Sequence, residues 1–522
     1  MPTLHWIGKE KVVNHHQEVP YRVLEHKYGF RDGEQSAEDT GSGNMIIHGD
    51  NLEALKSLLP KYQGKINCIY IDPPYNTGNE KWVYNDNVNE PHIKKWLGEV
   101  VGTEGEDLSR HDKWLCMMYP RLALLHKLLS DKGVILISID DNEQANLKLL
   151  LDDIFGSNNY IGAFIWQKRK GGGNDSFFVG TDHEYVLSYV KDNNKQEQKW
   201  RVPYDEDYLK RYKFSDEKGR YYYDTLSRPG LNNPIIYDVV CPDGSVIKDG
   251  TWQISEQTFK EGLATGEVDF IKNREGGYTV VRKVRVPAEG KVFRSIITNV
   301  SNKDAADEME DLFGQKKAFS TPKPTKLIND LISLVSDKNA IILDSFAGSG
   351  TTAHSVLNLN KDGGNRKFIL VEMEEYAEDI TAERVRRVIQ GYGEGKKAVE
   401  GTGGAFDFYE LGVPLFHEDG TLNEEVGEDK IREYIFFSDT QQPLQERTPD
   451  NKYYLGNAFE TAYYFYYERD AMTILNHEAL RQIVTKRAEQ YIIYADICTL
   501  TEDEMSRLGV VFKKIPRDIK RF

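Results

Sequence analysis

Two short stretches of this sequence carry side chains whose types and spacing could do chemistry. The first, Asp72-Pro73-Pro74-Tyr75, directly follows the apolar run 66–71. Two prolines after a buried strand prevent both ladder hydrogen bonds and a helix, so the chain must turn sharply. At the carboxyl end of a parallel strand, this turn would present the Asp72 carboxylate, the Pro73 carbonyl and the Tyr75 ring to a cleft. The three groups suit a flat heterocycle with an exocyclic amine, although a plain strand-ending turn would also explain the four residues.

The second stretch runs from Asp344 to Thr352, with the sequence Asp-Ser-Phe-Ala-Gly-Ser-Gly-Thr-Thr, after a strand predicted at 340–343. Gly348 and Gly350 would let backbone amides approach a bound ligand, and the start of the following helix favours a carboxylate there. An NTP-binding loop would need a Gly-Lys-Ser/Thr sequence, and this stretch has no lysine. We therefore interpret it as a cofactor loop and not as part of an NTPase.

Two further acids stand at the ends of predicted strands. Glu372 follows the strand 367–371, where an acidic residue would accept hydrogen bonds from the two ribose hydroxyls of a cofactor. Asp50 follows the strand that begins at Met45, and a helix N-cap is its simplest explanation. We predict that Asp344, Glu372 and Asp50 line one pocket and that the Asp72 turn lies beside it.

The order of the two motifs resembles that of the amino-methylating DNA methyltransferases of the β group, which implies S-adenosylmethionine as cofactor. Roughly residues 40–415 resemble, more narrowly, the modification (Mod) subunits of type III restriction-modification systems. By this resemblance Asp72, Pro73, Pro74 and Tyr75 are catalytic, Asp50 contacts the cofactor adenine, and the block Phe319–Pro324 closes over the methionine end. The implied cofactor-binding residues are Asp50, Lys323, Asp344, Phe346, Ala347, Gly348, Ser349, Gly350 and Glu372.

The expected reaction is in-line transfer of a methyl group to the N6 amine of an adenine flipped out of double-stranded DNA. We expect no covalent enzyme intermediate and no metal, with Tyr75 stacked on the base. N4-cytosine methylation is chemically equivalent at the amine, and Asp in place of Ser before Pro-Pro-Tyr favours adenine by resemblance. The sequence also leaves open an RNA methyltransferase and a non-catalytic DNA-recognition subunit of a defence complex. The resemblance further implies a homodimer and a restriction partner with helicase and nuclease activity.

Composition limits the kinds of partner. The 522 residues include 67 basic and 83 acidic side chains, so the net charge of −16 has the wrong sign for a non-specific nucleic-acid binder and any DNA-binding face must be local. The four cysteines form no Cys-x-x-Cys pair, which argues against a zinc site or a disulfide framework. We find no signal peptide and no run of apolar residues long enough to span a bilayer, and we expect a cytoplasmic protein without a membrane partner.

The elements that would position these residues predict an α/β fold. We expect a doubly wound, seven-stranded sheet of the S-adenosylmethionine-dependent methyltransferase type, with an inserted target-recognition domain and a small C-terminal α/β domain. The predicted segments are a polar, irregular N-terminal arm (1–43), a catalytic half (44–190), a target-recognition domain (191–318), a cofactor-binding half (319–415) and a C-terminal domain (416–522).

Four other segments could contribute to a site. Residues 76–98 form a candidate lid or cofactor-contacting loop. The basic segment Lys168–Asn174 is either a solvated loop or a phosphate contact, and His183-Glu184-Tyr185, which resembles a block of the same family, is most simply a packed strand start. In the inserted segment, aromatic residues alternate with a basic group that would suit DNA contacts: Arg282, Lys283, Arg285, Lys291 and Arg294.

Overall fold

A computed structural model of the chain describes residues 4–77, 98–99, 110–171, 177–197, 199–227, 230, 233–274, 276–315, 317–444 and 451–517. The chain divides into two compact units. The larger comprises Met1–Gln198 and Arg294–Phe522, and the smaller comprises Lys199–Phe293. Most of the candidate lid, residues 78–97, lies outside the described residues.

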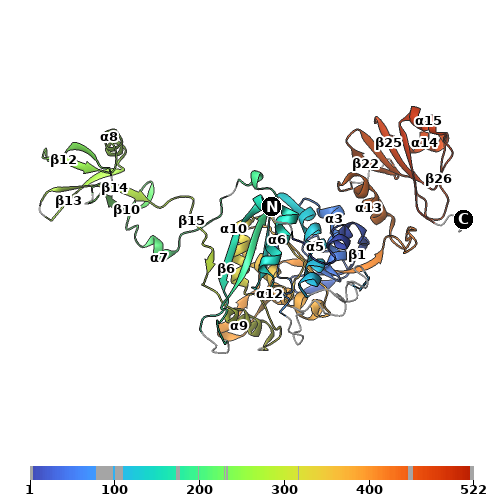
Figure 1. Cartoon of the computed structure of the whole chain (residues 1–522), viewed down its shortest axis with the longest axis horizontal. Helices are drawn as coiled ribbons and strands as arrows, with labels where there is room; N and C mark the ends of the chain where they lie inside the picture. Colours follow the sequence, from blue (N-terminus) through green and yellow to red (C-terminus); the bar gives the residue numbers. More distant parts are fainter. Residues whose placement is uncertain are drawn as a thin grey trace. The chain divides into compact units, whose positions relative to one another are not determined.

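The larger unit is built on one sheet of eleven described strands, in the order β16-β6-β7-β5-β4-β17-β18-β3-β21-β1-β2 (Figure 1). From β5 through β21 the neighbouring strands are parallel, and β7 is antiparallel to both β5 and β6. The strands are β1 (Arg22–Arg31), β2 (Glu34–Ser36), β3 (Met45–His48), β4 (Ile66–Ile71), β5 (Leu129–Ile139), β6 (Tyr160–Gln167), β7 (His183–Val190), β16 (Ile296–Ile297), β17 (Ile341–Asp344), β18 (Lys367–Glu372) and β21 (Ala405–Pro414).

Helices pack on both faces of this sheet, which confirms the doubly wound α/β architecture. One face carries α3 (Asn51–Tyr62), α5 (Arg110–Leu128) and α6 (Gln144–Phe155), whose apolar side chains form one core with alternate residues of β4 and β5. Outside that core, α10 (Thr325–Val335) packs on β4, and α11 (Thr351–Leu359) packs on β18 and on α12 (Glu383–Gln390). In the described part of the chain, no helix has the length and hydropathy needed to cross a membrane.

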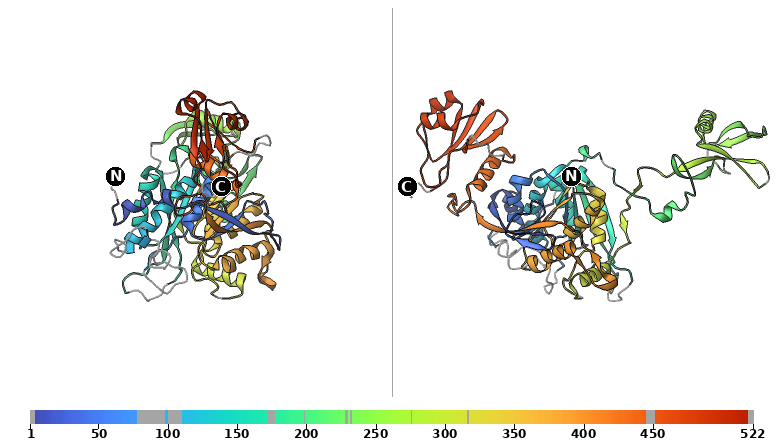
Figure 2. Two further views of the ribbon diagram at one scale, coloured as in Figure 1. Left: turned by 90° about the vertical axis from the view of Figure 1, so that its right-hand side faces the viewer. Right: turned by 180° about the vertical axis from the view of Figure 1, so that it is seen from behind.

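The sheet is wider than the seven strands predicted, because both edges are extended. The seven strands from β6 to β3 form its centre, and β16 is added beyond β6. The predicted irregular N-terminal arm is wrong: the ten residues of β1 pair antiparallel with β21, and Figure 2 shows β1 (blue) beside β21 (orange). Tyr28 of β1 stacks on Phe408 of β21 at 5.2 Å between ring centroids. The weakly alternating sequence of β1 forms a strand because this distant partner satisfies its backbone groups.

Two short N-terminal helices, α1 (Lys9–Val12) and α2 (His15–Glu18), also pack against α5 and place Val12 in the main core. The helix α9 (Asn302–Phe313) follows β16 in the chain. Because α9 and β16 belong to the larger unit, the smaller unit is narrower than the predicted segment 191–318.

The smaller unit contains a four-stranded sheet, β13-β14-β10-β9, and a separate hairpin, β11-β12. Trp252, Phe259 and Val280 lie in its own hydrophobic core. Its elements are β8 (Arg201–Val202), α7 (Glu206–Leu209), β9 (Phe214–Asp216), β10 (Gly219–Thr225), β11 (Ile235–Val240), β12 (Val246–Trp252), α8 (Glu256–Thr265), β13 (Val268–Lys272), β14 (Tyr278–Arg285) and β15 (Lys291–Val292).

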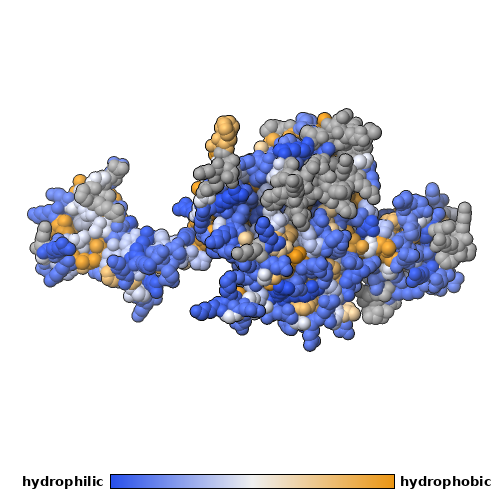
Figure 3. Space-filling view, turned by 90° about the horizontal axis from the view of Figure 1, so that it is seen from below, coloured by the Kyte–Doolittle hydropathy of each residue, from blue (hydrophilic) through white to orange (hydrophobic). Residues whose placement is uncertain are grey.

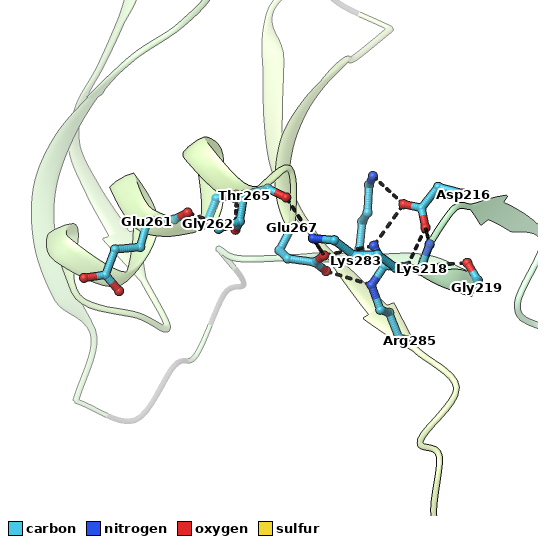
Figure 4. A network of polar contacts seen from close by, with 9 residues as sticks. All are labelled: Asp216, Lys218, Gly219, Glu261, Gly262, Thr265, Glu267, Lys283 and Arg285. Atoms are coloured by element: carbon cyan, nitrogen blue, oxygen red, sulfur yellow. Dashed lines mark hydrogen bonds and ion pairs between the residues drawn. The ribbon is translucent and has the colours of Figure 1, made fainter.

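The basic side chains of β14 have acidic partners within this unit (Figure 4). Arg285 donates hydrogen bonds to both Asp216 and Glu267, at 2.6–3.0 Å. Lys283 also bonds to Asp216, at 3.0 Å, and Arg282 pairs with Asp224 at 3.0 Å. These pairs link β14 to β9, to β10 and to the residue before β13, so much of the positive charge noted in the sequence is neutralised locally.

The C-terminal residues form a four-stranded sheet, β22-β23-β25-β27, whose core contains the aromatic run around Tyr464 and Phe465. Phe437 of α13 (Glu428–Thr440) belongs instead to the main core, and this segment is part of the larger unit. The remaining elements are β19 (Gly391–Tyr392), β20 (Val399–Glu400), α13 (Glu428–Thr440), β22 (Tyr454–Ala458), β23 (Thr461–Phe465), β24 (Ile474–Leu475), α14 (His477–Ile483), β25 (Gln490–Ala495), β26 (Ile497–Cys498), α15 (Glu502–Leu508) and β27 (Val510–Lys514). On the face drawn in Figure 3, hydrophilic residues predominate and apolar residues form only small patches.

Candidate active site

The four predicted acids lie at the carboxyl ends of four adjacent parallel strands. Asp72 follows β4, Asp344 ends β17, Glu372 ends β18 and Asp50 follows β3 by two residues. Hydrogen bonds join the loops: the Gly49 amide donates to the Glu372 carbonyl at 2.9 Å, and the Asn51 side chain donates to the Ser345 carbonyl at 2.9 Å. Strand order therefore brings together residues that are up to 322 positions apart, since parallel strands end at the same edge of a sheet.

The Asp-Pro-Pro-Tyr turn is held by contacts from three directions. The Tyr75 hydroxyl donates to Asp72 Oδ1 at 2.7 Å and is 3.1 Å from Glu184 Oε2. The Trp114 indole of α5 donates to the Pro74 carbonyl at 2.6 Å. Asn76, with a positive φ of 59°, donates to the buried carboxylate of Glu143. Tyr75 is only 8% exposed, and its hydroxyl has a role that the stacking interpretation did not include.

Two lysines and a second carboxylate complete this end of the site. Lys323 Nζ lies 2.6 Å from Asp72 Oδ2, 3.5 Å from Glu184 Oε2 and 4.9 Å from the centroid of the Tyr75 ring. Lys168 Nζ lies 3.0 Å from the other oxygen of Glu184. Lys323, which the resemblance implies as a cofactor contact, thus binds the predicted catalytic carboxylate directly.

Glu184 is the site residue that sequence reasoning missed. It is the second residue of β7 and lies in what the sequence predicts as a packed strand start, yet its side chain is only 9% exposed and contacts Tyr75 and both lysines. The available signal was a carboxylate in a strand that is mostly apolar or aromatic, since a buried charge requires partners. Lys168 belongs to the predicted basic loop, and the structure gives its ammonium an acidic partner at the base of that loop.

Burial and neighbouring charges act in opposite directions on the two carboxylates. Burial raises the pKa of Asp72, against the opposing effect of the Lys323 ammonium. Burial also disfavours ionisation of Glu184, but its two lysine partners, Lys323 and Lys168, hold the pKa of Glu184 below its ordinary value. Glu184 is therefore the more readily ionised carboxyl of the pair.

A pocket lies between the Asp72 turn and the glycine loop. The lining includes several residues implied as site residues by the sequence, namely Asp72, Lys323, Asp344, Phe346, Ala347, Gly348 and Ser349, together with Tyr70, Phe319, Thr321, Pro322, Thr351 and Thr352. Asp50, Glu372, Gly350 and the Pro73–Tyr75 segment are not among the lining residues. Glu372 is nevertheless close, because its Oε2 accepts the Gly348 amide at 2.7 Å.

The glycine loop has the backbone conformation that its sequence predicts. Gly348 and Gly350 have φ values of 52° and 79°, which side-chain-bearing residues rarely adopt, and a Cβ at Gly350 would stand 3.0 Å from the Thr381 carbonyl. Behind the loop, the fully buried Arg384 donates to the hydroxyls of Ser349 and Thr351, each at 2.9 Å. The loop is thus fixed by its glycines and by a buried guanidinium.

The two acids beside the loop are buried and hard to ionise. Burial raises the pKa of Asp344 to about 7, although the Thr352 hydroxyl and the Phe346 amide both donate to its carboxylate. Burial raises the pKa of Glu372 to about 8, and the amides of Glu374 and Gly348 oppose this rise. Such shifts are common at functional sites, where a ligand supplies the missing partners.

Asp50 caps a helix, as the simplest interpretation of the sequence predicted. Its Oδ1 accepts the amides of Leu52 and Glu53, at 2.8 and 3.2 Å, at the start of α3. The other oxygen lies 3.4 Å from the guanidinium of the buried Arg121, and the side chain is 39% exposed. A cofactor contact by Asp50 is compatible with this arrangement and stays a prediction.

Comparison with known proteins gives matches to DNA methylases. Residues 66–383 match the DNA methylase family. The StyLTI Mod subunit of Salmonella typhimurium is 38% identical over 358 residues, which are 65% of this chain and 54% of the relative. The EcoPI Mod subunit of Escherichia phage P1 is 32% identical over 420 residues, 72% of this chain and 64% of the relative. These two type III subunits are longer proteins, of which this chain spans between about half and two thirds.

A shorter relative is covered more fully. The type II methyltransferase M.KpnI of Klebsiella pneumoniae is 33% identical over 366 residues, 64% of this chain and 81% of the relative. Among solved structures, the cytosine-N4-specific PvuII DNA methyltransferase is 13% identical, over 65% of this chain and 86% of that one, with a TM-score of 0.35.

Proposed function

Because this chain belongs to the DNA methylase family, we propose that it transfers a methyl group from S-adenosylmethionine to the N6 amine of an adenine flipped out of double-stranded DNA. One observation carries the proposal: a single pocket is lined by both Asp72 and the glycine loop Phe346–Ser349. The group that would hold an amine and the backbone that would hold a cofactor therefore face the same space.

The residues around the glycine loop fit S-adenosylmethionine. Glu372 is a buried carboxylate at a strand end, suited to two ribose hydroxyls, and Asp50 would reach the adenine. Gly350 is followed by the nine-residue helix α11, whose N-terminus favours the ligand's carboxylate. When bound, the cofactor supplies an electrophilic methyl group on a sulfonium sulfur.

At the other end of the pocket, Asp72 would accept a hydrogen bond from the amine and the Pro73 carbonyl would accept a second. Both acceptors turn the nitrogen lone pair toward the methyl group. The bound cofactor would supply the methyl group and leave as a thioether, and the proton that the methylated amine loses would pass through its hydrogen bond to Asp72. Holding the two reactants in line can contribute about 7–11 kcal/mol. A strong base is not needed, because the amine becomes acidic only once it carries the methyl group.

Adenine and cytosine are the two bases whose exocyclic amines fit this chemistry. Asp in the first motif position supports adenine over cytosine, whose N4 amine presents the same chemistry. The type III relatives are named as Mod subunits of restriction-modification enzymes, and on that basis we also propose a homodimer that binds a restriction subunit. The smaller unit, which lies in the sequence between Asp72 and the glycine loop, would read the DNA sequence.

The test is methylation of plasmid DNA that carries no previous methylation. The protein and an Asp72→Ala variant are incubated with S-adenosylmethionine, and the nucleosides are analysed by mass spectrometry. We expect N6-methyladenine with the native protein and none with the variant. Formation of N4-methylcytosine would identify cytosine as the target base. Absence of any modified base, with cofactor binding intact in calorimetry, would refute catalysis by this chain alone.

A further inference from the structure

The Asp72 carboxylate has no free oxygen in this structure. Its Oδ1 accepts the Tyr75 hydroxyl at 2.7 Å, and its Oδ2 binds the Lys323 ammonium at 2.6 Å. Both Asp72 and Lys323 are largely buried, with side chains 19% and 10% exposed. A substrate amine that donates to Asp72 must therefore share or replace a short ion pair in a poorly hydrated site, where such pairs are strong.

A second carboxylate, that of Glu184, lies near enough to bind the Lys323 ammonium if it leaves Asp72. Glu184 Oε2 is 3.5 Å from the same Lys323 nitrogen, beyond a good hydrogen bond but within reach of a small rotation of the lysine side chain. The other oxygen of Glu184 is bound to Lys168 at 3.0 Å, which fixes the carboxylate in place. Glu184 also accepts the Tyr75 hydroxyl at 3.1 Å, so it contacts both groups that bind Asp72.

We propose that Glu184 is a positioning residue that accepts the Lys323 ammonium when the target amine reaches Asp72. Lys323 is then a counter-ion that changes partners: it neutralises Asp72 in the empty site and moves to Glu184 as Asp72 turns to the amine. This inference rests on the proposed function of Asp72 as the amine acceptor.

The charges of the two acids and the two lysines in this network balance. Asp72 and Glu184 carry two negative charges, and Lys323 and Lys168 carry two positive ones. A buried charge that loses its partner is strongly unfavourable, so Lys323 can leave Asp72 only if another carboxylate receives it. With Lys323 on Glu184, both ammonium groups bind that carboxylate, and the charge of Asp72 is held by hydrogen bonds from the Tyr75 hydroxyl and the neutral amine.

The titrating groups that face this network come from every surrounding element. Tyr70 of β4 and Asp344 of β17 lie near Asp72, and Asp140, after β5, lies near Glu184 and Lys168. Glu184 raises the pKa of Asp72 and Lys323 lowers it. Removing Glu184 should therefore lower the pKa of Asp72, and removing Lys323 should raise it. Asp344 is present in both variants and affects them alike.

The experiment compares single-turnover methylation from pH 5 to 9 for the native protein, Glu184→Gln, Lys323→Met and the double variant. In Glu184→Gln, Lys323 stays on Asp72, so we expect a rate loss of about 100-fold, the size that a misplaced reacting group can cause, and an acid limb at lower pH. In Lys323→Met the acid limb should move to higher pH. The double variant should be faster than Glu184→Gln, because no ammonium remains to occupy Asp72.

The controls separate this inference from the proposed function. An active native protein and an inactive Asp72→Ala variant establish the function of Asp72, whatever the other variants do. Glu197→Gln removes an acid that pairs with Lys132 at the surface, with its side chain 80% exposed, and should behave as the native protein. Cofactor affinity of Glu184→Gln, by calorimetry, should stay within about twofold of native. Three results would each contradict the exchange of partners by Lys323. They are additive rate losses in the double variant, acid limbs that move in the same direction in the two single variants, and loss of cofactor binding in Glu184→Gln.

Discussion

We expect the ionised Glu372 carboxylate to strengthen cofactor binding and to lower the free energy of unfolding of the cofactor-free protein. The side chain is 4% exposed, and burial raises its pKa from an ordinary 4.5 to about 8. A raised pKa of an acid means that the folded state binds the proton more tightly than the unfolded state does. The protonated form therefore contributes stability that is fully present below pH 4.5 and is lost as the pH rises through 8.

The magnitude follows from the linkage relation, at about 1.4 kcal/mol for each pKa unit. Between pH 6 and pH 9, ionising Glu372 in the empty site should cost the folded protein roughly 3 kcal/mol. A Glu372→Gln variant carries no charge and avoids this cost. Its free energy of unfolding, relative to the native protein, should therefore increase by roughly 3 kcal/mol between pH 6 and pH 9.

The assay is denaturant unfolding of both proteins at the two pH values, with Glu375→Gln as the control. Glu375 lies three residues further along the chain and is exposed, so its substitution should give the same difference at pH 6 and pH 9. Cofactor affinity supplies a second measurement. If binding requires the ionised carboxylate, the native protein should bind about tenfold more weakly at pH 7 than at pH 9, and Glu372→Gln should bind weakly at both. A native affinity that is flat over this range, with no pH-dependent stability difference, would refute the reasoning.

Three further predictions concern contacts in the site. Tyr75→Phe removes the hydrogen bonds to Asp72 and Glu184, so the rate of single-turnover methylation should fall about tenfold, the size of a lost hydrogen bond to a charged group. The rate of Tyr75→Ala should fall further. Equal rates for Tyr75→Phe and the native protein would show that only the ring matters. Asp50→Ala should reduce the free energy of unfolding by about 0.5–2 kcal/mol through loss of the α3 cap, and Asp50→Ser should restore most of it. Arg384→Met removes the guanidinium that lies 2.9 Å from the Glu308 carboxylate, so the free energy of unfolding should fall by about 3–5 kcal/mol. Denaturant unfolding measures this loss. An unchanged free energy of unfolding would mean that Glu308 is solvated.

Much of the fold could be predicted around the motifs, because local sequence controls those elements. The apolar run before Asp72 and the two prolines after it define the end of β4 without reference to any other segment. The glycines of the cofactor loop likewise require the positive φ values that the structure has at Gly348 and Gly350. The strand β1 was missed for the opposite reason: its sequence alternates weakly, and its partner β21 lies more than 370 residues away.

The sequence by itself determined the local turns at Asp72 and at the glycine loop, and it predicted which of their residues would take part in a methyl transfer. Only the tertiary structure decided which side chains surround Asp72. Lys323 follows it by 251 residues, and Glu184 lies on an antiparallel strand that looked like ordinary core. Their convergence depends on strand order, and strand order is set by packing of the whole sheet, which no local pattern contains.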